Sequence, residues 1–242
     1  MKLLLIITIF FSSLFGWIGE ITALKGDVKI IRNNYSISGT KGLKLEQKDI
    51  IKTSNNTKLQ VIFKDNTVIT IGKNSEVKIS DYIFDNVNSK ANFKLSHGIM
   101  KTLTGKIGKF APKRFKIRTK NASIGIRGTY FVVESYKDVI KLGMIYGITE
   151  FTNLDNNKVY IVSKGKQLIF KVKEPNNVII KDNFLENKTT NFKENVNSIN
   201  IEDFSDTINN DINHDEKNSI NQNTNKDNKI YTKFLEGLKD LF

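Results

Sequence analysis

The stretch IRTKNASIGIRGTYFVV, residues 117–133, decides the fold. Apolar residues recur at short spacing in its first half, and aromatic and β-branched residues fill its second half, which is typical of two strand segments. Arg127, Gly128 and Thr129 lie between them, and glycine takes a positive φ at a tight corner without a Cβ clash. We therefore expect a strand, a corner and a second strand. The five donors of Arg127 either bind the loose carbonyls of this corner or contact a ligand.

Similar short segments, rich in Val, Ile, Phe and Thr and separated by Gly, Asn or Asp, recur from residue 20 to residue 175. Leu59, Val61 and Phe63 alternate with polar positions, and Asp65-Asn66 follows as a hairpin turn because Asn tolerates the left-handed region. No long amphipathic helical pattern occurs before residue 180. The sequence thus predicts a single all-β domain over 20–175, with about a dozen or more short strands.

The first 19 residues have the organisation of a secretory signal peptide. Lys2 precedes an apolar run, and small and polar residues follow as far as Gly19, which predicts cleavage between Gly16 and Gly19. The alternative is an uncleaved membrane anchor, because Trp17 and Ile18 lengthen the apolar run. We expect an exported protein that is periplasmic, associated with the cell envelope or secreted.

The composition changes after residue 175. Residues 176–228 are rich in Asn, Lys and Asp with isolated apolar residues, which predicts a disordered tail. Residues 229–242 predict a short amphipathic helix, and a helix of this length needs a surface on which to lie, in its own domain, a partner or a bilayer. Its apolar residues are Ile230, Phe234, Leu235, Leu238, Leu241 and Phe242.

The net charge of +13 is unevenly distributed along the chain. Residues 20–180 hold 29 basic and 13 acidic residues, whereas residues 181–242 hold 8 Lys and 12 acidic residues. No acidic residue occurs between Asp85 and Glu134, and a block of this kind attracts anions. Phe110 and Phe115 would add apolar contacts to a basic face. The candidate anion-binding residues are Lys101, Lys106, Lys109, Lys113, Arg114, Lys116, Arg118 and Lys120.

An alternative is that the basic face is only solvated, or is covered by the acidic tail of the same chain. Two kinds of partner are expected. The first is an envelope protein, and the second is an anionic surface, either a polymer or a lipid. A nucleic acid is not expected, because the chain has no recognition motif and export removes that substrate. The sequence leaves the oligomeric state open.

The inventory of reactive side chains argues against catalysis. The chain has no cysteine, which excludes disulfides, thiolate metal sites and a cysteine nucleophile. Its two histidines, His97 and His214, are far apart, so neither a His-rich metal site nor a Ser-His-Asp triad is expected. Glu134 and Glu150 belong to no recognisable motif. We expect no enzymatic activity, no metal and no cofactor.

Several of these segments together resemble the FecR domain over residues 20–172. The run L-x-x-x-D-x-I-x-T spans residues 45–53, and QVIFKDNTVITI spans residues 60–71. The most specific part is A-x-x-G-x-R-G-T-x-F. Its fixed residues are Ala122, Gly125, Arg127, Gly128, Thr129 and Phe131.

The resemblance implies an envelope protein with an all-β, roll-like or solenoid-like domain that contacts other proteins, as in sigma-regulator signalling, without enzymatic activity. Signalling members of the family have a cytoplasmic helix bundle and a membrane helix before this domain, whereas only a leader is expected here. Lys48 replaces the usual Gly before Asp49. A positive φ at Lys48 would cost about 1 kcal/mol. The resulting hypothesis is an exported protein-binding or signalling module, with a binder of anionic envelope polymers as the alternative.

Overall fold

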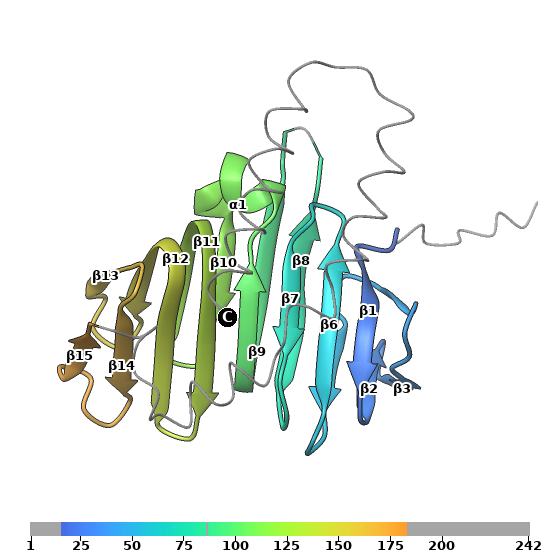
Figure 1. The fold of residues 1–242 in the computed structure, drawn as a ribbon, viewed down its shortest axis with the longest axis horizontal. Coiled ribbons are helices and arrows are strands. Elements are labelled where there is room, and N and C mark those ends of the chain that lie inside the picture. Colours follow the sequence, from blue (N-terminus) through green and yellow to red (C-terminus); the bar gives the residue numbers. More distant parts are fainter. Residues whose placement is uncertain (1–15, 86, 183–242) are drawn as a thin grey trace, which may run out of the picture. The chain divides into compact units, whose positions relative to one another are not determined.

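The computed structural model describes residues 16–85 and 87–182, in which fifteen strands form one sheet (Figure 1). The all-β expectation is confirmed, whereas the roll-like or solenoid-like arrangement stays a prediction. The strands are β1 (Gly19–Lys25), β2 (Val28–Arg32), β3 (Tyr35–Ser38), β4 (Lys44–Leu45), β5 (Ile50–Thr53), β6 (Lys58–Phe63), β7 (Val68–Ile71), β8 (Glu76–Ile83), β9 (Lys90–Leu103), β10 (Phe115–Arg118), β11 (Ala122–Tyr136), β12 (Val139–Asn153), β13 (Val159–Ser163), β14 (Gln167–Lys171) and β15 (Val178–Lys181).

Two short helical elements interrupt the strands. The helix α1 (Lys106–Phe110) follows β9, and the 3₁₀ helix η1 (Pro112–Arg114) follows α1. The turn of α1 is held by Asp65, whose carbonyl accepts from the Lys106 N–H at 2.7 Å and whose Oδ2 accepts from the Ile107 N–H at 3.1 Å. No helix among the described residues is long and apolar enough to cross a membrane.

The long strand β9 changes partners along its length, and this exchange builds the sheet. Its first half pairs antiparallel with β8 and parallel with β10, whereas its second half pairs antiparallel with β7 and β11. β12 likewise pairs with β13 and β14 at different positions, and Figure 1 shows both beside it. The parallel β9–β10 pair joins segments that are distant in the sequence.

The β fold extends beyond the predicted limits of 20–175 at both ends. The Ile18 N–H donates to the Leu45 carbonyl at 2.8 Å, and β1 already includes Gly19. At the other end, β15 pairs with β14 and continues to Lys181. Most of the predicted signal peptide, most of the predicted tail and the predicted helix at 229–242 lie outside the described residues.

One continuous core is built from the inward faces of these strands. Phe93 belongs to this core, and its ring centroid lies 5.2 Å from that of Phe63 and 5.7 Å from that of Phe115. Ala122 and Phe131, from the FecR-like motif, are also fully buried in this core. Aromatic pairs at such distances add to the stabilisation that burial of their surface gives.

The expected corner at Gly128 is a bulge within the single strand β11. β12 pairs with β11 on both sides of it, Arg127 opposite Ile148 and Tyr130 opposite Tyr146, so the chain does not turn away. Gly128 has the predicted positive φ, +59°. The residue that follows β9 fixes the bulge, because the Thr129 N–H donates to Thr104 Oγ1 at 2.8 Å. An extra residue in one strand is accommodated in this way without ending the ladder.

Replacement of two glycines at this bulge by Ala should have unequal effects. A Cβ at Gly147, which has φ +83°, would lie 2.6 Å from the Gly128 carbonyl oxygen, whereas a Cβ at Gly128 meets nothing within 4 Å. We expect Gly128→Ala to lower the free energy of unfolding by about 1 kcal/mol, and Gly147→Ala by about 2 to 4 kcal/mol because overpacking adds to the cost of left-handed backbone. Urea denaturation measures both, and equal losses would contradict the packing at Gly147.

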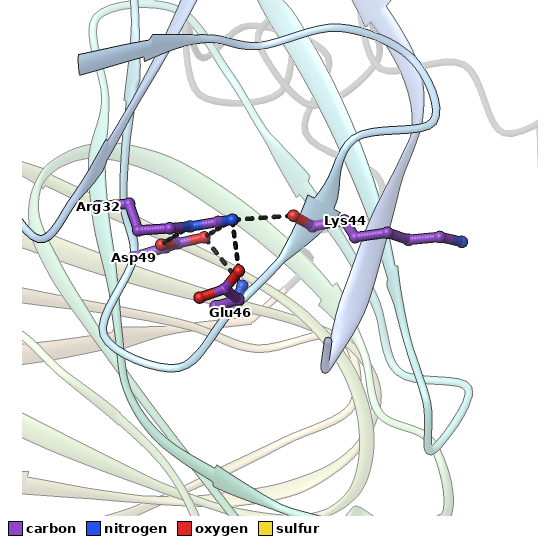
Figure 2. Close-up of polar contacts among 4 residues, drawn as sticks. All are labelled: Arg32, Lys44, Glu46 and Asp49. Atoms are coloured by element: carbon purple, nitrogen blue, oxygen red, sulfur yellow. Dashed lines mark hydrogen bonds and ion pairs between the residues drawn. The ribbon is translucent and has the colours of Figure 1, made fainter. Parts of the chain in front are cut away.

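Asp49 of the FecR-like motif binds Arg32 from β2 (Figure 2). Arg32 Nε donates to Asp49 Oδ1 at 2.9 Å and Arg32 Nη2 to Asp49 Oδ2 at 2.7 Å. Arg32 also pairs with Glu46 at 2.6 Å and donates to the Lys44 carbonyl at 2.8 Å. Lys48, next to Asp49, has a positive φ of +74°. The motif thus connects β2 to the turn between β4 and β5.

Candidate functional site

A cationic depression lies where β8, β9, β10 and η1 meet, with a volume of about 490 Å³. The parallel pairing of β9 and β10 places Lys94 opposite Arg118 and Asn92 opposite Lys116. The 3₁₀ helix η1 brings Lys113 and Arg114 to the same site. The lining residues are Ser80, Asp81, Lys90, Asn92, Phe93, Lys94, Lys113, Arg114, Lys116 and Arg118.

The lining contains six cationic side chains and a single carboxylate, that of Asp81. Asp81 is already engaged, since Oδ2 pairs with Lys90 Nζ at 2.7 Å and Oδ1 accepts from Gln47 Nε2 at 3.1 Å. Arg114 Nη1 donates to the Val87 carbonyl at 2.8 Å. Four cations have neither an ion pair nor a hydrogen bond within the described part of the chain. These are Lys94, Lys113, Lys116 and Arg118.

This arrangement can bind an anion at several points. The guanidinium of Arg118 presents a planar fork that matches a carboxylate or a phosphate, and the lysine ammonium groups act as mobile point charges around it. The depression is open to solvent, so each ion pair is worth only about 0.2 to 1 kcal/mol and is weakened by salt. A ligand must therefore contact several of these cations at once.

The predicted anion-binding residues are only partly brought together. Lys113, Arg114, Lys116 and Arg118 line the depression. Lys106, Lys109 and Lys120 are exposed but lie outside its lining. Of the predicted apolar contacts, Phe110 is exposed, whereas the prediction for Phe115 is wrong because its ring is fully buried in the core.

The prediction that Lys101 belongs to the basic face is wrong. Its side chain is 3% exposed, and its Nζ lies 4.9 Å from the centroid of the Tyr130 ring. Burial, together with the charge of Lys58, lowers the pKa of Lys101 to about 7. A buried ammonium of this kind is not available to a ligand in the depression.

Lys90 and Lys94 were missed as members of the site. Both belong to the acid-free block, so composition alone could have included them. They join Lys116 and Arg118 only because β9 and β10 pair in parallel across the intervening chain of α1 and η1. Sequence periodicity does not reveal such a pairing.

Arg127 does not hold the bulge as one interpretation expected. Its side chain is exposed, and it makes no hydrogen bond or ion pair with any residue in 16–85 or 87–182. The bulge is instead bound through the backbone of Thr129 and the side chain of Thr104. The other interpretation, that Arg127 contacts a ligand, stays a prediction.

The two carboxylates named in the sequence, Glu134 and Glu150, lie far apart along the β11–β12 ladder. Glu134 lies opposite Lys141 and pairs with it at 3.4 Å, whereas Glu150 lies opposite Gly125 at the other end of the β11–β12 ladder. Over residues 16–85 and 87–182, no cluster of three or more His, Asp or Glu could hold a metal ion.

Comparison with known proteins places the depression within a family match. Residues 49–148 match the family model described as FecR protein, which confirms the resemblance over that range. Two crystal structures of a candidate anti-sigma factor from Parabacteroides distasonis, at 2.50 and 1.65 Å resolution, each have a TM-score of 0.46 and 16% identity. Each alignment covers 55% of this chain and 59% of the crystallised one, so the chain spans less than two thirds of that protein. The sequence matches none of the curated proteins with which it was compared.

Proposed function

We propose that this protein, which carries a FecR domain match over residues 49–148, is a non-enzymatic signalling module that binds another protein at the cell envelope. The observation that carries the proposal is the cationic depression, because all of its lining residues fall within the matched range. Four of its cations have no partner in the described chain and are available to an acidic segment of a partner protein.

Apolar surface next to these cations adds to what such a partner can bury. Val87, whose carbonyl accepts from Arg114, is exposed, and Phe110, the last residue of α1, is also exposed. Burial of apolar area contributes roughly 25 cal/mol per Å² and does not weaken with salt as ion pairs do. A protein partner that covers Val87 or Phe110 would therefore stay bound at moderate ionic strength.

The second candidate function is binding of an anionic envelope polymer, such as the phosphates of lipopolysaccharide. The observation that favours it is the same set of unpaired ammonium and guanidinium groups, which suits phosphate as well as carboxylate. Salt separates the two candidates. Polymer binding that rests on ion pairs alone should fall steeply between low and physiological ionic strength.

Export is part of the proposal and rests on the apolar leader at residues 1–19. Cleavage before Ile18 would keep the two backbone hydrogen bonds that this residue makes in the fold. The Ile18 N–H donates to the Leu45 carbonyl, and the Ile18 carbonyl accepts from the Lys64 N–H at 3.0 Å.

Charge reversal in the depression should abolish partner binding. The baits are residues 17–242 in three forms: wild type, the double variant Lys94→Glu/Arg118→Glu, and the control Lys106→Glu/Lys120→Glu. The control has the same net charge change at exposed cations outside the depression. We expect wild type and control to capture the same protein from an envelope extract. The depression variant should capture at least about tenfold less of it, because two attractive contacts become repulsive.

Mass spectrometry of the captured material at low and at physiological salt gives the readout. Equal capture by the depression variant and the control would overturn the proposal. Capture of an anionic polymer alone, lost at physiological salt, would favour the second candidate function.

A further inference from the structure

Four strands of the described chain each pair with a single neighbour, and β13 differs from the other three in composition. The four strands are β3, β4, β13 and β15. β4 spans two residues, β3 has serine at every second position, and β15 ends with Lys181. β13 has the sequence VYIVS, with five residues and no charge. Proteins protect free sheet edges with short strands or charged residues, so β13 is the least protected of these edges.

The backbone of β13 presents hydrogen-bonding groups to its free side at every second residue. Next to the β12–β13 ladder, the Asn153 N–H donates to the Lys158 carbonyl at 2.9 Å. Groups that point to the partner strand alternate along an antiparallel pair, so every second residue after Lys158 also points toward β12. The N–H and C=O groups of Val159 and Ile161 therefore point away from β12, and no strand of the described chain pairs with them there.

The side chains at this edge form an exposed apolar patch, which consists of Ile148, Val159 and Ile161. Val159 and Ile161 are each 56% exposed, and Ile148 on β12 is 50% exposed. The ladder places Ser163 opposite Ile148, so Ile161 is a diagonal neighbour of Ile148 on the same face. A strand added beside β13 would form cross-strand pairs with Val159 and Ile161 and bury part of their apolar surface.

Exposed lysines flank β13 at both ends. Lys158 precedes the strand and Lys164 follows it, and neither ammonium forms an ion pair with any residue in 16–85 or 87–182. In an antiparallel pair of two copies of β13 centred on Ile161, Lys158 of each copy would face Lys164 of the other. Like charges directly opposite each other are destabilising. This edge therefore favours a different strand, one with acidic residues near its ends.

We propose that β13 binds an extended segment of another protein by strand addition, and that this segment has alternating apolar residues and acidic residues near its ends. Backbone hydrogen bonds to Val159 and Ile161 would give affinity, while the apolar patch and the two lysines would give specificity. The inference goes beyond the proposed function, because no residue of β13 lines the cationic depression.

A synthetic peptide tests the proposal. The probe is fluorescently labelled Thr-Asp-Val-Thr-Ile-Thr-Val-Asp-Thr, and its anisotropy is measured against residues 17–242. When its Ile lies opposite Ile161, its two Asp residues lie opposite Lys158 and Lys164. We expect saturable binding that becomes about tenfold weaker when the backbone nitrogens of Val, Ile and Val are methylated, because these point toward β13 in that antiparallel register. Methylation of the two Thr nitrogens between them is the matched control and should weaken binding far less.

Variants of the protein test the same contacts from the other side. Ile161→Pro removes an outward N–H without removing a ladder hydrogen bond, so it should weaken peptide binding about tenfold and leave the urea midpoint close to wild type. Lys158→Glu/Lys164→Glu should reverse the charge preference, so that a peptide with Lys in place of both Asp residues binds better than the original. Lys94→Glu/Arg118→Glu changes only the depression and should bind the peptide like wild type, which separates this test from that of the proposed function.

Absence of saturable binding up to about 0.5 mM peptide would overturn the proposal, and so would equal affinity of the two methylated peptides. If Ile161→Pro unfolds the domain, the methylated peptides still decide the outcome, because they leave the protein unchanged. A wild-type protein that sediments as a dimer and becomes monomeric on Ile161→Pro would also overturn it, and would assign the edge to a second copy of the chain.

Discussion

Replacing Asp49 by Asn is expected to lower the free energy of unfolding by about 2 to 4 kcal/mol, because it breaks a partly buried ion pair with two hydrogen bonds. The Asp49 side chain is 0% exposed and that of Arg32 is 20% exposed. Asp49 Oδ2 also accepts from the Glu46 N–H at 2.9 Å. Hydrogen bonds to Asp49 raise the pKa of Arg32 above its usual value, so the charged pair is the stable form. The variant would leave the guanidinium with Glu46 as its remaining carboxylate partner.

Glu20→Gln provides the matched control, because Glu20 pairs with Lys44 at a more exposed position. Exposed pairs contribute about 0 to 1 kcal/mol, so this variant should unfold close to wild type. Urea denaturation of both variants gives the two values with a common slope. An Asp49→Asn protein as stable as the Glu20→Gln protein would show that the Arg32–Asp49 pair does not hold β2 in place.

Replacing Lys101 by Met is expected to raise stability at pH 6 by about 3 kcal/mol, and the gain should shrink as the pH rises toward 10. Burial, with the charge of Lys58, lowers the pKa of Lys101 from 10.5 to about 7 in the folded protein. Below pH 7 the folded state must hold a buried ammonium, and its cost is fully present. Between pH 7 and 10.5 the unfolded chain binds more protons, so wild-type stability rises with pH over that window.

The charge of Lys58 acts in the same direction as burial on the pKa of Lys101. Lys58 on β6 adds repulsion, and on β11 Glu134 is paired with Lys141 at 3.4 Å. Met fills a similar volume without a charge, so its packing cost is small. Lys120→Met, at an exposed position, should show no such pH dependence. A difference between Lys101→Met and wild type that stays constant from pH 6 to 10 would mean that Lys101 is solvated in the folded state.

Local features of the structure could be predicted from the sequence because short-range sterics determine them. The turn at Asn66 has φ +63° and Gly128 has φ +59°, each as its sequence context indicated. The all-β class followed from short alternating segments for the same reason. The continuation of β11 through Gly128 could not be predicted, because it depends on pairing with β12 on both sides of the bulge.

The positive charge of the candidate site could be predicted from the sequence, but the residues that line it could not. The acid-free block marked the correct part of the chain, and four of its eight named residues line the depression. The register between β9 and β8 is irregular near His97, and β9 changes partners there. Because of this, the start of the strand does not tell which face each later residue lies on, and Lys101 was assigned to the wrong face. Lys94 joined the site through the parallel pairing with β10, a contact between distant segments.

The most direct measurement of whether the depression contacts a protein is site-specific photo-crosslinking in living cells. A photoreactive phenylalanine analogue replaces Asn92, which lines the depression, or Tyr35, which is exposed on β3. We expect a discrete, protease-sensitive adduct from position 92 that is absent at position 35 and is lost when Lys94→Glu/Arg118→Glu is added. No protein adduct at position 92, or the same adduct from both positions, would contradict a protein-binding role for the depression.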